Sequence, residues 1–249
     1  MISYLFVLIA GLIAGSISGV IGTGASIILL PILVYTFGPK AAVPIMAVAA
    51  VMANLARVIA WWKLIDWRAF AAYSITGIPA AAMGARTLLA LPANLINIFL
   101  GVFFIAMIPV RHWLILRNFR MRLWQLSVCG AFIGFLTGLV LSTGPLSVPA
   151  FTAYGLIKGA FIATEAASSL FLYVSKVITF GEFGAMPPDI FIKGLLVGGS
   201  LMIGTFAGKF FMLKLSDQAH SYLLDALLLF SGLSLLWAAY SNTAQSFSH

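Results

Sequence analysis

The sequence predicts an all-α membrane protein built from two halves of similar plan, and three observations lead to that prediction. Of 249 residues, 62% are apolar and only 8% are charged, whereas a soluble domain is about half apolar and about a quarter charged. Nearly the whole chain divides into long apolar runs, and the features of the first half recur in the second. The composition excludes a soluble enzyme, a nucleic-acid-binding protein and a disordered chain.

Ten apolar runs follow one another, from which we expect eight to ten membrane helices. In order they are 4–21, 25–37, 41–62, 67–89, 95–116, 126–141, 146–157, 160–180, 190–213 and 222–240. A helix needs about 20 apolar residues to cross a bilayer, so the runs 25–37 and 146–157 are too short. We therefore favour one broken or re-entrant helix pair plus about three full spans in each half, with full crossings as the alternative.

An internal repeat explains why the short runs come in a pair. Three glycines recur in order and spacing, since Gly11, Gly15 and Gly19 are followed in the second half by Gly130, Gly134 and Gly138. Other recurring features are Thr23-Gly24 as Thr143-Gly144, Pro31 as Pro149, Gly38 as Gly155, and Arg57 as Lys176. Such self-similarity is the mark of a duplicated architecture. We divide the chain into a first repeat (1–116), a basic connector (117–124) and a second repeat (125–249).

Charge predicts how the two repeats lie in the membrane. The region around the connector is basic and has no acid: it holds Arg111, His112, Arg117, Arg120 and Arg122. Residues 1–6 and 241–249 carry no Lys or Arg. By the positive-inside rule the connector is cytoplasmic and both termini lie outside. Each half then makes an odd number of net crossings, so the second half is inserted upside down, as in many secondary transporters.

The two Gly-rich breaks are the strongest candidates for a binding site. They comprise Gly22, Thr23, Gly24 and Ser26 in the first half and Ser142, Thr143 and Gly144 in the second. A helix that starts at a break presents free N–H groups and the positive end of its dipole, both of which attract anions. The hydroxyl groups add further donors. The sequence predicts a small anion pocket near the membrane midplane, and close helix packing is the alternative.

Two basic residues lie inside apolar runs at equivalent repeat positions. A charge within a membrane span is costly and indicates function, so Arg57 and Lys176 are candidates for contact with an anion. The alternative is that each long side chain reaches the interface. Asn54 lies one turn before Arg57 and faces the same side, and Tyr173 stands in the matching place in the second half.

Glu165 and Asp225 are the acids that lie within apolar runs, Glu165 about one turn from the start of its run, and either could carry a coupling proton. Interfacial exposure is the alternative for Glu165, and pairing with a basic residue for Asp225. The three histidines, at positions 112, 220 and 249, are too scattered for a metal site. No nucleophile–base pair or nucleotide motif is present, so we expect no catalytic residues, no cofactor and no nucleic-acid partner.

These motifs resemble one family. The spacing Gly11-x-x-x-Gly15-x-x-x-Gly19-x-x-Gly22-x-Gly24 followed by Pro31 looks like the opening of the TauE/SafE family of sulfite-exporter-like membrane proteins. The second half echoes it from Gly134 through Gly144 to Pro149, although Thr23, Ala25 and Pro145 depart from the family's glycine-rich pattern. The resemblance covers essentially the whole chain.

The resemblance implies a secondary transporter that exports small sulfur-containing anions, such as sulfite or an organosulfonate like sulfoacetate, driven by an ion or proton gradient. Uptake of a related sulfur compound is the alternative, and so is a non-transporting membrane subunit. The expected partners are a small anionic substrate and the lipid bilayer, with a homodimer left open. We expect the protein in a bacterial plasma (inner) membrane.

Overall fold

The computed structural model describes residues 2–21, 25–116, 120–140, 143–156, 158–209 and 217–246. Within these residues the chain forms ten α-helices and one short 3₁₀ helix, and no β-strand is present. The helices are α1 (Ile2–Ile21), α2 (Ala25–Phe37), α3 (Pro39–Trp61), η1 (Trp62–Leu64), α4 (Trp67–Leu89), α5 (Ala93–Leu116), α6 (Leu123–Leu139), α7 (Gly144–Tyr154), α8 (Lys158–Glu182), α9 (Pro188–Lys209) and α10 (Asp217–Ser246). The all-α prediction is confirmed.

The two short helices, α2 and α7, are each followed by a glycine with positive φ, 77° at Gly38 and 109° at Gly155. Gly155 has the left-handed αL conformation that commonly ends a helix, whereas Gly38 combines its positive φ with a ψ of 160°. Glycine adopts both conformations without a steric penalty. The recurring pair Gly38 and Gly155 therefore marks the turn from each short helix into the long helix that follows it, α3 or α8.

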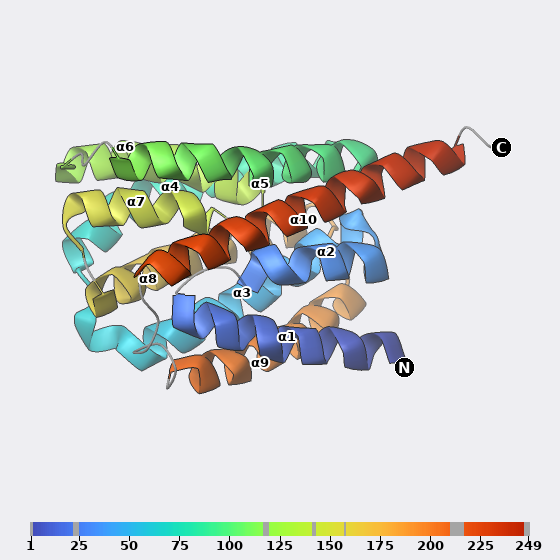
Figure 1. The fold of residues 1–249 in the computed structure, drawn as a ribbon, viewed down its shortest axis with the longest axis horizontal. Helices are drawn as coiled ribbons and strands as arrows, with labels where there is room; N and C mark the ends of the chain where they lie inside the picture. The colour runs from blue at the N-terminus through green and yellow to red at the C-terminus, as the bar shows by residue number, and fades with distance from the viewer. Residues whose placement is uncertain are drawn as a thin grey trace.

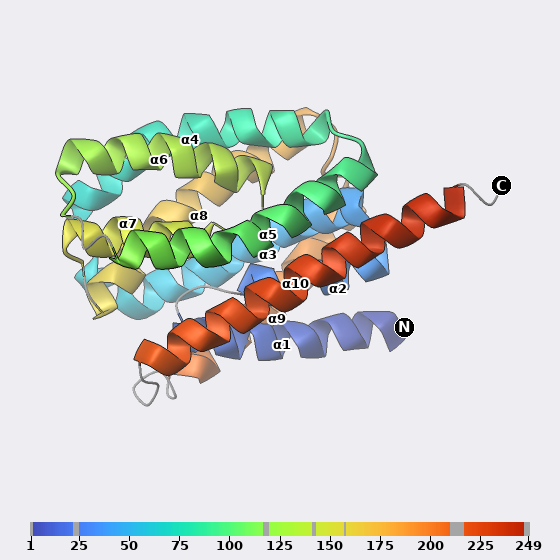
Figure 2. The same ribbon diagram turned by 45° about the horizontal axis from the view of Figure 1, so that its top comes forward.

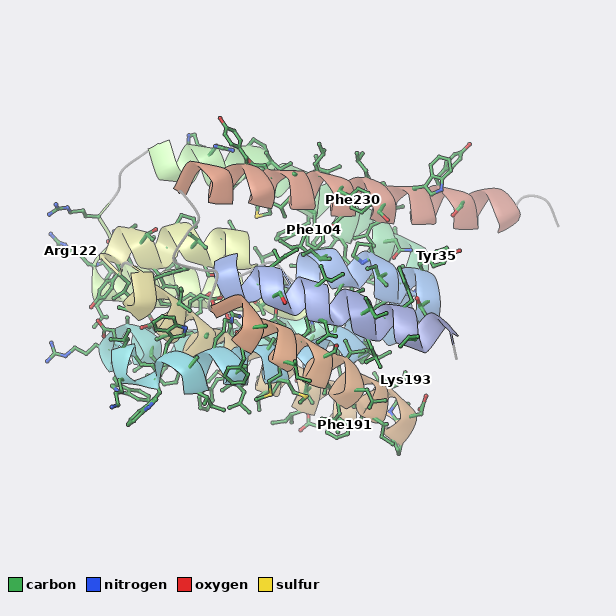
Figure 3. The ribbon with its side chains drawn as sticks, turned by 60° about the horizontal axis from the view of Figure 1, so that its bottom comes forward. Tyr35, Phe104, Arg122, Phe191, Lys193 and Phe230 are labelled. Carbon is green, nitrogen blue, oxygen red and sulfur yellow. The ribbon has the colours of Figure 1, made fainter. Side chains whose placement is uncertain are left out.

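Apolar side chains cover the outside of the bundle. Phe230 is 72% exposed and Phe191 is 40% exposed, whereas Phe104 is fully buried (Figure 3). Three of the described helices are long and apolar enough to cross a membrane by length and composition: Pro39–Leu64, Gly159–Glu182 and Pro188–Gly208. A lipid environment accepts such a surface, which water does not. The chain is an integral membrane protein.

The direction of the helices is visible in the ribbon views. Helix α10 ends at the end of the bundle at which α1 begins (Figures 1 and 2). Helix α1 runs away from that end, whereas α6 runs toward it. Arg122, which directly precedes α6, projects at the opposite end (Figure 3). The basic connector region and the end of α10 therefore lie at opposite ends of the molecule.

Each helix of the first half packs against a helix of the second half, and the pairs match. Helix α1 packs on α9, and α6 packs on α4; α2 packs on α10, and α7 packs on α5. The other large contacts join α3 to α8, α5 to α10, α3 to α9 and α4 to α8. If α1 to α5 are counted as the counterparts of α6 to α10, each of these contacts has a counterpart or joins two equivalent helices.

Glycine makes the α4–α6 and α1–α9 crossings close. A Cβ atom added to Gly84 or Gly138 would lie 2.0 Å or 2.1 Å from a backbone oxygen of the partner helix. At the α1–α9 crossing the corresponding distances are 2.3 Å for Gly15 and 2.2 Å for Gly204. Small residues allow backbones in a membrane to approach in this way. The glycines of the repeat thus serve helix packing, and they hold α4 and α9 against the broken helix pairs.

Candidate functional site

A polar cavity lies where the two short helices begin. Five helical elements contribute to its lining: Ser18 from α1, Ala25 and Ser26 from α2, Asn54 and Arg57 from α3, Thr143 and Gly144 at the start of α7, and Glu165, Ser169 and Tyr173 from α8. Most of the apolar part of the lining comes from α3, namely Met46, Ala50 and Ala53. The structure thus gathers residues from both predicted breaks and from both halves.

The start of α7 faces the cavity directly. Thr143 precedes the helix, and its carbonyl oxygen accepts hydrogen bonds from the N–H groups of Leu146 and Ser147, both at 2.9 Å. Its hydroxyl is 2.5 Å from the hydroxyl of Thr137 on α6. The first N–H groups of a helix lack partners within the helix. In α7, Pro145 has no N–H and the N–H groups of Leu146 and Ser147 already donate to Thr143. The N–H of Gly144 and the positive end of the helix dipole are therefore what this turn offers to the cavity wall.

The start of α2 lies in the lining of the same cavity. Ala25 and Ser26, the first two residues of α2, are both buried there. The predicted site residues Gly22, Thr23, Gly24 and Ser142 lie outside the described residues. Of the site residues predicted at the two breaks, the structure describes Ser26 in the first half and Thr143 and Gly144 in the second.

Helix α3 turns one face toward the cavity, because Met46, Ala50, Asn54 and Arg57 recur at helical spacing. The side chain of Arg57 is buried, with 7% of the residue exposed. Its Nη2 donates to Oδ1 of Asn54, and Nδ2 of Asn54 donates to the carbonyl oxygen of Ala50 at 2.8 Å. The Nε atom of Arg57 is buried and has no partner among the described residues.

Helix α8 supplies the opposite wall through Glu165, Ser169 and Tyr173, which are four residues apart. Glu165 is 3% exposed, and its Oε2 lies 3.1 Å from Nη1 of Arg57. Its Oε1 accepts hydrogen bonds from the hydroxyls of Ser169 at 2.8 Å and Ser147 at 3.3 Å. Glu165 is therefore not an interfacial side chain but half of a buried ion pair.

Lys176 has a different environment. It is fully buried, and its Nζ donates to the carbonyl oxygens of Thr137 at 3.0 Å and Val140 at 3.3 Å. These carbonyls belong to the end of α6, where the last C=O groups lack partners within the helix. Nζ also lies 5.5 Å from the ring centroid of Phe180. Lys176 does not line the cavity and does not reach the surface; it caps the helix that precedes the second break.

Asp225 lies away from the cavity, on α10. Its Oδ2 is 2.7 Å from Nε2 of His112 on α5, and nearly half of the His112 side chain is exposed. The structure therefore pairs Asp225 with a basic residue, which the sequence left open as an alternative to proton coupling. Helices α5 and α10 are counterparts in the two halves and pack on each other.

Sequence reasoning missed three hydroxyl groups, those of Ser18, Ser147 and Ser169. Ser169 lies one turn after Glu165 on the same face of the helix, so its spacing could have indicated it. Ser18 comes just before the first break, and Thr137 holds the matching place before the second. Ser147 could be recognised only from the fold, because its contact with Glu165 joins two different helices.

The cavity is small in this conformation. Its volume is about 30 Å³, room for about two water molecules. A sulfur oxyanion has four or more heavy atoms and needs more space. An anion therefore fits beside Arg57 only after a side chain or a short helix moves.

The described residues form an apolar helical bundle with a polar cavity at the starts of two short helices. This is the architecture of a membrane transporter. Comparison with known proteins then gives the family. The profile of the family described as "Sulfite exporter TauE/SafE" matches residues 7–235. The chain therefore belongs to the TauE/SafE family of membrane transporters.

A curated relative agrees with this assignment. The chain is similar to a protein of Bacillus subtilis (strain 168) described as "Probable membrane transporter protein YjnA", with 23% identity over 253 residues. The match covers 92% of this chain and 98% of the relative. No solved structure matches the chain.

Proposed function

We propose that this protein is a secondary transporter that exports a small sulfur-containing anion, such as sulfite or an organosulfonate like sulfoacetate. The anion binds in the cavity between the starts of α2 and α7. One observation carries the proposal: a buried guanidinium, whose Nε atom has no partner in the described part of the chain, shares a single cavity with both helix starts. Oxyanions accept several hydrogen bonds at once, and helix N-termini together with Arg supply them in a convergent arrangement.

Two inverted repeats make the binding site accessible from each side of the membrane in turn. Support comes from the opposite directions of α1 and α6 (Figures 1 and 2) and from the matched helix contacts across the halves. In this mechanism one pair of broken helices opens toward each side of the membrane. Rocking of one half against the other then exposes the Arg57 site alternately to the two sides. An ion gradient drives the cycle, and the outward gradient of the anion itself is one such gradient.

The connector region faces the cytoplasm of a bacterial cell, at the inner membrane, and both termini face outward. Lys63, Arg68 and Arg122 support this orientation, because they lie at the α3–α4 turn and just before α6, at the same end of the bundle (Figures 2 and 3). By the positive-inside rule that end is cytoplasmic. Cysteine labelling from each side of the membrane tests the orientation. Labelling of positions 120 and 246 from the same side would contradict it.

Flux in proteoliposomes tests the proposed function. Purified protein is reconstituted, and movement of labelled sulfite, sulfate, thiosulfate and sulfoacetate is measured in both directions. We expect exchange of at least sulfite or sulfoacetate, and net flow down the imposed gradient. The absence of flux and of binding for all four would contradict the substrate class and favour a non-transporting membrane subunit. Flux only in the inward direction would favour uptake.

A further inference from the structure

The carboxylate of Glu165 lies where an anion would have to bind. Its Oε2 atom lies 3.1 Å from Nη1 of Arg57, and Glu165 is part of the lining of the cavity. Its two oxygens accept from three side chains: Arg57, Ser169 and Ser147. An opposite charge at this distance favours the ionised form of a carboxyl group. In this conformation, Glu165 therefore provides the negative charge that balances the buried guanidinium.

Space and charge prevent the carboxylate and a substrate anion from sharing Arg57. The carboxylate already bonds to Nη1 of Arg57, and the free volume beside the pair is about 30 Å³. An oxyanion that bonds to this nitrogen therefore takes the place of the carboxylate. With Glu165 still ionised, two negative charges would face one positive charge in a buried site. Like charges at close range in low dielectric are strongly unfavourable, and one of them takes up a proton instead.

The other groups around Glu165 leave no second acid to take that proton. The charged or titratable groups that face it are Arg57 on α3, Tyr73 on α4 and Tyr173 on α8. Helices α6 and α7 also adjoin the site, and α7 contributes the hydroxyl of Ser147. Within the described residues, Glu165 is the carboxylate of this cavity.

We infer that Glu165 exchanges its partner during transport: an anion takes its place on Arg57 when the Glu165 carboxyl accepts a proton, so one proton crosses with each anion. This inference rests on the proposed function. The charge of the site balances in both states. The empty site holds one guanidinium cation and one carboxylate anion. The loaded site holds the guanidinium, a neutral carboxylic acid and the substrate anion.

The direction of net flux follows from this exchange. With a monovalent anion, the loaded and the empty sites have the same charge, so transport is electroneutral and does not respond to membrane potential. A divalent anion carries one net negative charge across. Export then proceeds while the outward anion gradient exceeds the inward proton gradient, and an acidic exterior drives uptake. Proton and anion always move in the same direction.

Methanesulfonate is the probe, because its sulfonate remains ionised throughout the working pH range and its own titration does not intervene. Binding to purified full-length protein is measured by calorimetry between about pH 5 and pH 8. We expect wild-type affinity to rise by up to about tenfold for each unit that the pH falls, as proton linkage requires. In proteoliposomes, a trapped pH dye should report one proton for each methanesulfonate that enters.

Two substitutions on α8 provide the matched comparison. Glu165→Gln imitates the protonated carboxyl, and we expect affinity that no longer depends on pH and anion exchange without proton movement. Glu182→Gln changes the same residue type at an exposed position on the same helix, and it should behave as wild type. If Glu165→Gln does not fold, the wild-type proton count still decides the question.

Three results overturn the inference in distinguishable ways. Methanesulfonate binding by wild type that does not vary with pH, or flux without protons, removes the coupling and leaves the proposed function intact. If the affinity of Glu165→Gln for methanesulfonate depends on pH as steeply as that of the wild type, another group takes up the proton. Absence of binding and flux for methanesulfonate, sulfite and sulfoacetate alike overturns the proposed function together with the inference.

Discussion

Arg57 and Lys176 occupy equivalent positions in the two halves, yet they have different surroundings. Arg57 lies in the lining of the central cavity and pairs with Glu165 at 3.1 Å. Lys176 donates to two backbone carbonyls at the end of α6 and lies outside that lining. A guanidinium presents five donors in a planar fork, whereas an ammonium is a compact charge. The Arg57 position suits an oxyanion, and the Lys176 position suits the end of a helix.

The difference comes from the neighbours rather than from the repeat. Glu165 aligns with Met46 in the first half, and both side chains line the same cavity. Both halves have a basic residue at the matching position, but among the described residues of this cavity the acid comes from the second half. In the proposed mechanism, this acid determines which of the two bases contacts the anion.

The largest expected effect is that of Arg57→Met. Loss of the buried charged donor costs about 3 kcal/mol of anion binding, which lowers affinity by about 100-fold or more. The change also leaves Glu165 without its cation, so the variant should unfold at a lower temperature. Sulfite flux in proteoliposomes and thermal unfolding in detergent measure the two effects.

The double variant Arg57→Met/Glu165→Gln separates folding from binding. Removing both partners of a buried pair is tolerated better than removing one, so thermal stability should recover while transport stays absent. Recovery of transport in the double variant would show that Arg57 does not hold the anion.

Lys176→Met should affect stability more than binding. It leaves the carbonyl oxygens of Thr137 and Val140 without a donor, at a cost of about 1–3 kcal/mol in the free energy of unfolding. The apparent KM for sulfite should stay within about threefold of wild type, a difference of less than 1 kcal/mol. A large rise in KM with unchanged stability would place Lys176 in contact with the anion and remove its contrast with Arg57.

Thr143→Val should weaken binding moderately. In this conformation the Thr143 hydroxyl donates to the hydroxyl of Thr137, which gives its own proton to the carbonyl oxygen of Ile133. When it turns to an anion it is one neutral donor, and its removal costs about 1 kcal/mol, or about fivefold in affinity. Thr205→Val is the control, since Thr205 is also buried but bonds to Leu201 within its own helix, α9. Equal effects of the two substitutions on sulfite affinity would argue against a ligand at the start of α7.

Asp225→Asn should have the smallest effect. The His112–Asp225 contact lies between α5 and α10 and is partly exposed, and such pairs contribute about 0–1 kcal/mol to stability. We expect unchanged proton stoichiometry and a slight fall in thermal stability. Loss of proton movement with preserved anion exchange would transfer the coupling role from Glu165 to Asp225.

Much of the helical architecture follows from the sequence. The apolar runs 25–37 and 67–89 have the same bounds as α2 and α4, because each run is delimited by glycine, polar or proline residues. The pairing of the short helices was predictable as well, since Pro31 and Pro149, and Gly38 and Gly155, keep their order. Hydropathy and helix-ending residues are local signals, and they act before any tertiary contact forms.

The partners of the buried charges were not predictable in the same way. Arg57 and Glu165 lie on α3 and α8, more than a hundred positions apart in the chain. The sequence of neither helix shows that the two helices pack on each other. The carbonyl partners of Lys176 are backbone atoms, which any sequence supplies. Glu165 was an expected coupling acid and Arg57 an expected anion contact, but their mutual contact emerges only when α3 packs on α8.

The most direct test of the central claim is to locate the anion. Selenite has the shape of sulfite, and its selenium can be found by anomalous scattering in crystals of the full-length protein. We predict selenium within about 4 Å of the Arg57 guanidinium, between the starts of α2 and α7, as for an ion in direct hydrogen-bond contact, with the Glu165 carboxyl displaced. Selenium beside Lys176, or at the surface with the Arg57–Glu165 pair intact, would contradict the account.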